Sequence, residues 1–266
     1  MKFLIIDGSY YNFFRYYAIV QWFNLAKSDQ EMGIPIENAE FVDKFRSTFV
    51  EKISEFQKKL KWKTCVKIVA KDCPRKDIWR NDIFNKYKQS RDKDTGFMGG
   101  PLFKLAYKEL YNDAGINAIV SYPRLEADDC AALTAKRIIE TVPNAEIVII
   151  TSDMDYLQLA SDKITLINLK YQDLSKSKNA TGNPQLDKFC KIVCGDKSDD
   201  IPGIFKKCGM KTAIKMYNDK SLFEKKLEDE EGSKEKFILN QKLVDFDFIP
   251  QELVSGFRRE VLGVCE

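Results

Sequence analysis

Aspartates and glutamates recur in this sequence beside short apolar segments, in a pattern that could hold metal ions. Asp7 closes the first apolar segment, and Asp72 comes two residues after the segment that ends at Ala70. Further acids follow in two groups: Glu126, Asp128 and Asp129, and then Asp153 and Asp155. Any one of them could be an ordinary helix cap or turn residue. Together, however, so many carboxylates could not all stay ionised at one place without a compensating charge, which divalent cations supply.

Oxygen ligands of this kind suit hard cations such as Mg²⁺, for which Mn²⁺ can substitute. Two such ions about 4 Å apart form the usual clamp for an in-line displacement at phosphorus. The chain contains no histidine, and this absence removes the usual general base near neutral pH and the serine–histidine and cysteine–histidine nucleophiles. The sequence therefore favours metal-dependent cleavage of phosphodiester bonds.

Two basic regions accompany the acids. From Lys58 to Lys93 there are 13 lysines and arginines against 4 aspartates, interleaved with aromatic residues. This favours a nucleic-acid surface, although a solvated helical face is the alternative. Near the other end, Asp196 and Asp199 could face the metals, and they precede a Pro/Gly turn flanked by lysines that could grip a phosphate backbone. A generic turn between helices is the alternative there.

The elements that must position these residues follow from the hydrophobic pattern. Short apolar segments at 2–7, 65–70, 116–121, 145–151 and 164–169 alternate with helical patterns, which is typical of a parallel α/β sheet. Ligands of such sheets gather beyond the carboxyl ends of the strands, where the acids fall. Apolar residues recurring every three or four positions from Phe41 to Leu60 predict a core-facing helix.

The rest of the chain divides into an insertion and a helical end. Residues 74–98 are polar and basic, and we interpret them as an insertion that projects from the sheet before a helix at 102–112. No convincing strand follows residue 184, so we expect a sheet domain over 1–184 and a smaller helical domain over 185–266. No apolar run approaches the roughly 18 residues that span a bilayer. The first segment is too short for a signal peptide, and the seven scattered cysteines favour a reducing compartment, cytoplasmic or nuclear.

The ordered set of acids and basic residues resembles the 5′ nuclease family, which includes flap endonucleases, the 5′ nuclease domains of bacterial DNA polymerases and phage 5′ nucleases. The resemblance extends to about residue 220, and it rests on Asp7, Asp72, Tyr87-Lys-Gln-Ser-Arg91, Glu126-Ala-Asp-Asp129, Ser152-Asp-Met-Asp155 and Gly195-Asp-Lys-Ser-Asp199. It implies a PIN-like α/β fold with a helical arch at about 74–100. It also implies a C-terminal helix-three-turn-helix element that holds duplex DNA, often with a bound K⁺.

The resemblance also implies roles for individual residues. Nine acids would hold two metal ions directly or through water: Asp7, Asp72, Glu126, Asp128, Asp129, Asp153, Asp155, Asp196 and Asp199. Lys88 would be a catalytic lysine at the base of the arch, and Arg91 would contact a phosphate. Nucleic-acid contacts are expected from Arg15, Arg75, Arg80, Tyr87, Lys206, Lys207, Lys211, Thr212 and Lys215. The aromatic residues that follow Asp7, including Tyr11, Phe13 and Phe14, could either contact a displaced base or pack in the core.

The expected partner is DNA with 5′ single-stranded ends, flaps or nicks, in replication or repair. The sequence leaves open whether RNA in RNA–DNA hybrids is also cut, and both a viral and a bacterial source fit. The turn from Gly203 to Gly209 is one residue longer than the common form and carries lysine in place of glycine, so K⁺ binding there stays open. Residues 251–257 match a sliding-clamp motif poorly because Arg258 replaces its second aromatic residue. We expect that the protein does not bind a sliding clamp. We also expect it to be a monomer.

Three other functions fit the sequence less well. A branched-DNA-binding protein that has lost its chemistry would not need the full set of acids. A PIN-type ribonuclease would leave the basic insertion and the C-terminal unit unexplained. A dehalogenase-like phosphatase would need a second aspartate directly after the first strand, where Asp7-Gly8-Ser9 supplies one acid.

Overall fold

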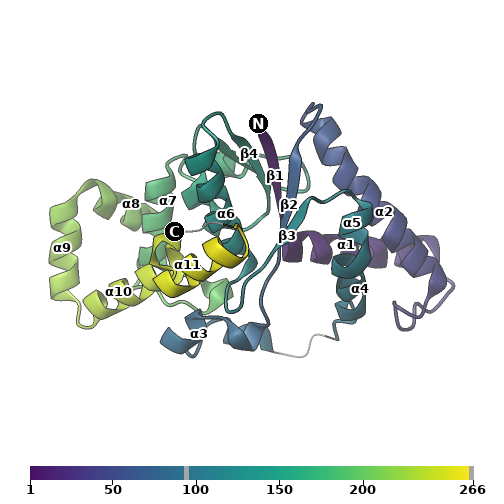
Figure 1. Cartoon of the computed structure of the whole chain (residues 1–266). Coiled ribbons are helices and arrows are strands. Elements are labelled where there is room, and N and C mark those ends of the chain that lie inside the picture. The colour runs from purple at the N-terminus through teal and green to yellow at the C-terminus, as the bar shows by residue number, and fades with distance from the viewer. Residues whose placement is uncertain (93–95, 264–266) are drawn as a thin grey trace.

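A sheet of five parallel strands lies at the centre of the molecule, in the order β3-β2-β1-β4-β5 (Figure 1). The strands are β1 (Lys2–Asp7), β2 (Val66–Ala70), β3 (Ala118–Val120), β4 (Glu146–Ile150) and β5 (Ile164–Ile167). This is a computed structural model, and it describes residues 1–92 and 96–263. Because β1 pairs in parallel with both β2 and β4, the carboxyl ends of these three strands meet at one edge of the sheet. The predicted parallel α/β fold is confirmed.

Helices cover both faces of the sheet, which explains why its strands are apolar throughout. Alternate residues of β1 point to opposite faces: Leu4 and Ile6 join one buried cluster, and Phe3 and Ile5 join another. The first face is covered by α1 (Gly8–Ala26), α2 (Ala39–Lys59) and the helical run of α4 (Gly100–Leu105), η3 (Ala106–Leu110) and α5 (Tyr111–Asp113). The second face is covered by α6 (Ala127–Thr141) and α11 (Gln251–Glu260).

The C-terminal region is helical, as predicted, and begins with α7 (Pro184–Cys194). The Asn183 side chain caps this helix by accepting hydrogen bonds from the backbone N–H groups of Gln185 and Leu186, and proline occupies its first turn. A series of turns leads to α8 (Met210–Asn218), which α9 (Lys220–Asp229) and α10 (Ser233–Val244) follow. Among the described residues, no helix combines the length and apolar character that crossing a membrane requires.

The segment predicted to be a helical arch differs from that expectation. Its described residues form only short helical turns: η1 (Arg75–Asp77), α3 (Arg80–Ile83) and η2 (Gln89–Asp92). They do not project freely, because Ile78 and Tyr87 lie in one buried cluster with Ile192, Ile201 and Leu243 of the C-terminal region. Residues 93–95 of the predicted arch lie outside the described residues. The segment is therefore held against the C-terminal helices next to the acids.

The expected division at residue 184 also differs from the structure. The chain returns to the sheet after α10, and Phe246, Ile249, Leu253 and Phe257 are buried in the same cluster as β1 and α6. In Figure 1, the yellow helix α11 lies beside α6 rather than with α8 and α9. The helical region that stands away from the sheet therefore ends near Val244.

Candidate active site

Two of the predicted acids lie at the carboxyl ends of neighbouring strands. Asp7 ends β1 and caps α1, accepting hydrogen bonds from the Tyr10 backbone N–H at 3.0 Å and from the Thr151 hydroxyl at 3.1 Å. Asp72, just beyond β2, accepts one hydrogen bond from the Ala127 backbone N–H at 2.7 Å and another from the Ser9 hydroxyl. Burial, and then repulsion from Asp72, raises the pKa of Asp7 to about 6. Burial also raises the pKa of Asp72.

A first group of acids stands at the start of α6. Glu126, Asp128 and Asp129 each offer a carboxylate oxygen within 4.8 Å of the others. Burial opposes ionisation of Glu126, but the nearby Lys88 and Arg80 cations lower its pKa below the usual value. Burial, followed by the charges of Asp129 and Glu126, raises the pKa of Asp128 well above its usual value.

A second group joins the end of β4 to the turn after α7. Asp155, Asp196 and Asp199 also offer oxygens that lie within 4.8 Å of one another. Asp153 lies beside them, and burial together with the Asp155 charge raises its pKa to about 7. Gly195 makes this turn possible: its φ is +73°, and a Cβ atom there would lie 2.4 Å from the Ile201 carbonyl oxygen.

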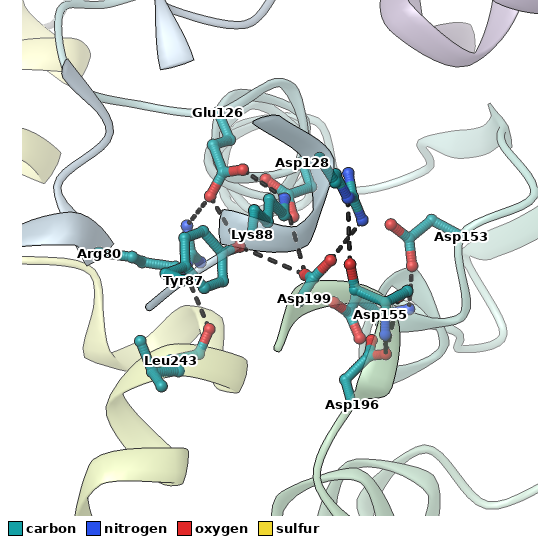
Figure 2. Close-up of polar contacts among 12 residues, drawn as sticks. Arg80, Tyr87, Lys88, Glu126, Asp128, Asp153, Asp155, Asp196, Asp199 and Leu243 are labelled. Carbon is teal, nitrogen blue, oxygen red and sulfur yellow. Dashed lines mark hydrogen bonds and ion pairs between the residues drawn. The ribbon is translucent and has the colours of Figure 1, made fainter. Parts of the chain in front are cut away.

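Three cations lie among these carboxylates. The Lys88 ammonium is 2.5 Å from Glu126 Oε1 and 3.6 Å from Asp199 Oδ2, so it connects the two groups (Figure 2). Arg91 pairs with Asp199 and donates to the Ser198 carbonyl at 3.1 Å. Lys191 contacts Asp155 and lies 2.5 Å from Asp196 Oδ2. Lys88 also has a left-handed backbone with φ of 53°, a conformation that is strained in residues other than glycine.

Asp129 is engaged differently from the other acids. Both of its oxygens accept hydrogen bonds from the Arg80 guanidinium, and the Trp79 indole N–H donates to one of them at 3.0 Å. The side chain is 0% exposed. Because protein donors already satisfy this carboxylate, it fits a structural counter-ion better than a metal ligand.

Three residues predicted to contact nucleic acid are buried instead. Arg80 is 1% exposed and binds Glu126, Asp129 and the Leu243 carbonyl. The Tyr87 hydroxyl donates to Glu126 at 3.0 Å, and that side chain is also buried. Arg15 lies in α1, where it is 7% exposed. Burial, which the sequence does not show, does not favour direct contact of these three side chains with nucleic acid, and that contact stays a prediction.

The other predicted contacts stay at the surface. Arg75 lies over the segment that carries Lys88, and its guanidinium donates to the carbonyls of Lys88 and Arg91. The C-terminal residues Lys206, Lys207, Lys211 and Lys215 are exposed, and Thr212 is half-buried. Their role in binding a duplex, and K⁺ binding in the turn before α8, stay predictions.

Lys191 is a residue that the sequence pattern did not indicate. It lies in the last turn of α7, five positions before Asp196. A basic residue at the end of a helix is an ordinary feature that stabilises the helix dipole, so its position alone gives no indication of a role. Only the folded turn after Gly195, which brings Asp196 back beside α7, shows where its ammonium lies.

The residues at this edge fit divalent metal ions. The donors are carboxylate oxygens from separate elements, most of them buried or half-buried, and such oxygens are the ligands that Mg²⁺ and Mn²⁺ prefer. Burial, followed by the charge of neighbouring carboxylates, raises the pKa values of Asp7, Asp128 and Asp153. A divalent cation would lower all three by favouring the ionised carboxylates.

Comparison with known proteins agrees with the family resemblance that the sequence motifs indicate. The family model described as "5′-3′ exonuclease, N-terminal resolvase-like domain" matches residues 2–187. The chain is 29% identical over 236 residues to a 5′-3′ exonuclease of Bacillus subtilis, a match that covers 86% of this chain and 73% of that protein. It is 25% identical over 266 residues to the ribonuclease H of Enterobacteria phage T4, covering 90% and 84% of the two chains.

Solved structures also resemble this fold. A bacteriophage T5 protein co-crystallized with metal ions matches with a TM-score of 0.67 at 19% identity over 100% of both chains. A complex of the T5 flap endonuclease with DNA and metal ions matches with a TM-score of 0.66 at 18% identity, covering 99% of this chain and 98% of that one. The predicted family resemblance and the PIN-like fold are confirmed.

Proposed function

Because the chain belongs to the 5′-3′ exonuclease family, we propose that it is a structure-specific 5′ nuclease that hydrolyses DNA phosphodiester bonds with two Mg²⁺ ions. The observation that carries this proposal is the meeting of acids from the ends of β1 and β4, the start of α6 and the turn after α7 at one edge of the sheet, beside Lys88. The two separate groups of acids support two ions. Mn²⁺ would substitute for Mg²⁺ at oxygen-only sites of this kind.

The proposed ligands are the acids named above except Asp129. Bound divalent ions would activate the attacking water and stabilise charge on the leaving oxygen. The protein fixes the ligands: Asp7 and Asp72 accept backbone hydrogen bonds from Tyr10 and Ala127, so neither carboxylate needs to reorganise when a substrate arrives. Pre-positioned groups of this kind lower the barrier because their orientation has been set during folding.

Lys88 and Arg91 would stabilise the charge that builds on the phosphoryl oxygens. Both cations lie on the short segment over the acids, and each contacts Asp199. Lys88 is held more firmly, since its side chain is 14% exposed against 47% for Arg91. Although burial opposes it, the charges of Glu126 and Asp199 keep the pKa of Lys88 above its usual value, so this residue acts as a cation and not as a base.

Exposed aromatic rings beside the acids support a single-stranded substrate. Phe13 and Tyr17 of α1 are 41% and 54% exposed, and the Phe13 ring lies 5.0 Å from that of Phe97 and 4.8 Å from that of Phe103. We name Phe13, Phe14, Tyr17 and Phe97 the aromatic platform. At a rise of about 1.5 Å per residue, Phe13 lies about 9 Å along the helix from Asp7. Unpaired bases next to the cleaved bond could stack on it. Tyr11, by contrast, is a core residue that donates to the Phe49 carbonyl at 2.6 Å.

The exposed lysines at 206, 207, 211 and 215 would hold the adjoining duplex by its phosphates. RNA–DNA hybrids are a further proposed substrate, since one relative is named ribonuclease H. We also propose that the protein acts as a monomer, because one chain supplies both groups of acids.

The direct test is product mapping on end-labelled flap, nicked and hybrid substrates with Mg²⁺ and with EDTA. We expect cleavage near the 5′ junction with Mg²⁺ and none with EDTA. Asp153→Asn should slow the wild-type rate by at least about 100-fold, or about 2.7 kcal/mol in the barrier. Asp162→Asn is the matched control, because Asp162 is exposed and precedes β5 at the opposite end of the strands.

Undiminished cleavage by Asp153→Asn would refute the metal assignment. Tight, metal-independent binding of flaps without cleavage would instead favour the branched-DNA-binding alternative.

A further inference from the structure

Lys191 occupies an unusual position for a lysine, inside the second group of acids. Its ammonium is 2.5 Å from Asp196 Oδ2, and it also contacts Asp155. Its side chain is only 20% exposed, and those of Asp155 and Asp196 are 11% and 14% exposed. A divalent ion at this group would therefore bind two of the carboxylates that the ammonium already contacts.

We propose that Lys191 weakens binding of a divalent ion at Asp155, Asp196 and Asp199, so that this ion binds tightly only after a substrate phosphate draws the ammonium away. The inference rests on the proposed function, since it assumes that the acids hold metal ions. Two cations that share the same carboxylates repel each other, and the repulsion is strong where the surroundings exclude water. A phosphate in the site would offer the flexible lysine side chain another anion.

The first group of acids is arranged differently. There, Lys88 contacts Glu126 of the first group and Asp199 of the second, while the buried Arg80 pairs with both Glu126 and Asp129 and donates to the Leu243 carbonyl. Among residues 1–92 and 96–263, no lysine forms ion pairs with two acids of the first group. Arg80 shares its charge with Asp129, which is not a proposed ligand, whereas both partners of Lys191 are proposed ligands. We therefore expect the ion beside Lys191 to be the weaker of the two in the free enzyme.

Helix α7 supplies a matched control for this lysine. Lys188 lies one turn earlier, its side chain is 15% exposed, and it also pairs with two aspartates, Asp245 at 2.7 Å and Asp247 at 3.8 Å. Neither aspartate belongs to the two groups of acids. Removal of the Lys188 charge thus reproduces the loss of a half-buried ion pair from α7 without changing the charge at the candidate metal site.

The test is a titration of free protein with Mn²⁺, in which electron paramagnetic resonance counts the unbound ion. In Lys191→Gln and Lys191→Met, the weaker of two Mn²⁺ sites should tighten by about tenfold, which corresponds to about 1.4 kcal/mol. Lys188→Gln should leave both sites unchanged. Circular dichroism would confirm that each variant is folded. An unchanged or weaker second site in both Lys191 variants overturns the proposal.

A second measurement uses the wild-type protein and does not depend on any variant folding. A flap oligonucleotide with a charged phosphorothioate at the cleavage position should tighten the weaker Mn²⁺ site. The same oligonucleotide with an uncharged methylphosphonate there should not, because it offers no anion to Lys191. Equal effects of the two oligonucleotides overturn the proposal. If the wild type binds no Mn²⁺ at all, the proposed function fails as well. If it binds two Mn²⁺ ions and neither affinity changes with the Lys191 substitutions or the phosphate charge, this inference alone is refuted.

Discussion

At the scale of single residues, burial raises the pKa of two acids of the cluster, Asp7 and Asp153. The pKa of Asp7 is raised to about 6 by burial and then by Asp72, and that of Asp153 to about 7 by burial and then by Asp155. In an unfolded chain the same carboxyls have a pKa near their ordinary value of 3.8. Between these values the folded protein holds protons that the unfolded chain has released.

These shifts predict how stability depends on pH in EDTA. Because the folded state binds more protons from about pH 4 to pH 7, the contribution of both acids to stability falls as pH rises through that range. We expect the Tm in EDTA to fall between about pH 4 and pH 7, and Asp153→Asn to reduce the fall. Thermal unfolding followed by circular dichroism measures it, with Asp162→Asn as the control. A fall of the same size in Asp153→Asn would show that this carboxyl is not the cause.

Arg80 is a positioning residue that ties three segments of the chain together. Its buried guanidinium holds Glu126 and Asp129 of α6 and donates to the Leu243 carbonyl of α10 at 2.8 Å. Arg80→Ala should cost about 3 to 5 kcal/mol of unfolding free energy, because it leaves buried carboxylates without their partner. Urea unfolding measures the loss. The control is Arg46→Ala, which removes a half-exposed pair with Glu109 and should cost about 1 kcal/mol or less. Equal losses of unfolding free energy in the two variants would mean that the buried ion pairs of Arg80 stabilise the protein no more than the half-exposed pair of Arg46.

Residue types and order were enough to predict that the acids gather at the strand ends, whereas Lys88 and Arg91 were singled out only by the family resemblance. Burial was not visible at this scale. Arg80 and Tyr87 looked like surface residues of a basic segment, yet Ile78, Trp79 and Tyr87 anchor that segment in the interior. Lys191 could not be predicted because its partners come from a turn whose course the sequence does not fix.

At the scale of elements, α1 serves the core with one side and presents the aromatic platform on the other. Phe13→Ala should weaken binding of a flap with a single-stranded 5′ end by about 5- to 100-fold, since stacking contributes about 1 to 3 kcal/mol per base. Fluorescence anisotropy under non-cleaving conditions measures this, with a blunt duplex for comparison. Leu25→Ala is the control, because Leu25 lies in the last turn of the same helix and is 76% exposed. If Phe13→Ala weakens binding of the blunt duplex as much as binding of the flap, the aromatic platform does not bind single strands selectively.

The strands could be predicted closely, while the insertion could not. The segment at 2–7 matches β1, and the one at 164–169 starts where β5 starts, since apolar runs in a buried parallel sheet leave few alternatives. The segment after Pro74 was expected to project because it is polar and basic. Its few apolar side chains pack against α7 and α10 instead, and those contacts join residues more than a hundred positions apart, beyond what a local pattern reports.

At the scale of the whole molecule, the last helix joins the sheet and the C-terminal helices into a single cooperative unit. Phe257 of α11 is fully buried against α6 and the sheet. Phe257→Ala should lower the unfolding free energy by about 3 to 5 kcal/mol and should do so in one transition. Urea unfolding followed by both fluorescence and circular dichroism tests this. Phe248→Ala, at a residue that is 42% exposed, should change it by about 0.5 kcal/mol or less. Two separate transitions would show that the sheet and the C-terminal helices unfold independently.

The strand order has a consequence for synthesis of the protein. Central β1 pairs with β4, whose partner residues lie about 144 positions later in the chain, and Asp199 joins the acids later still. Contacts of such long range form slowly, because the intervening chain must first be closed into a loop. A growing polypeptide on the ribosome therefore has no complete site until Asp199 has emerged. Asp7 is synthesised early, but the acids can act together only after residues 8–199 have been translated. The nascent nuclease is therefore inactive until that point.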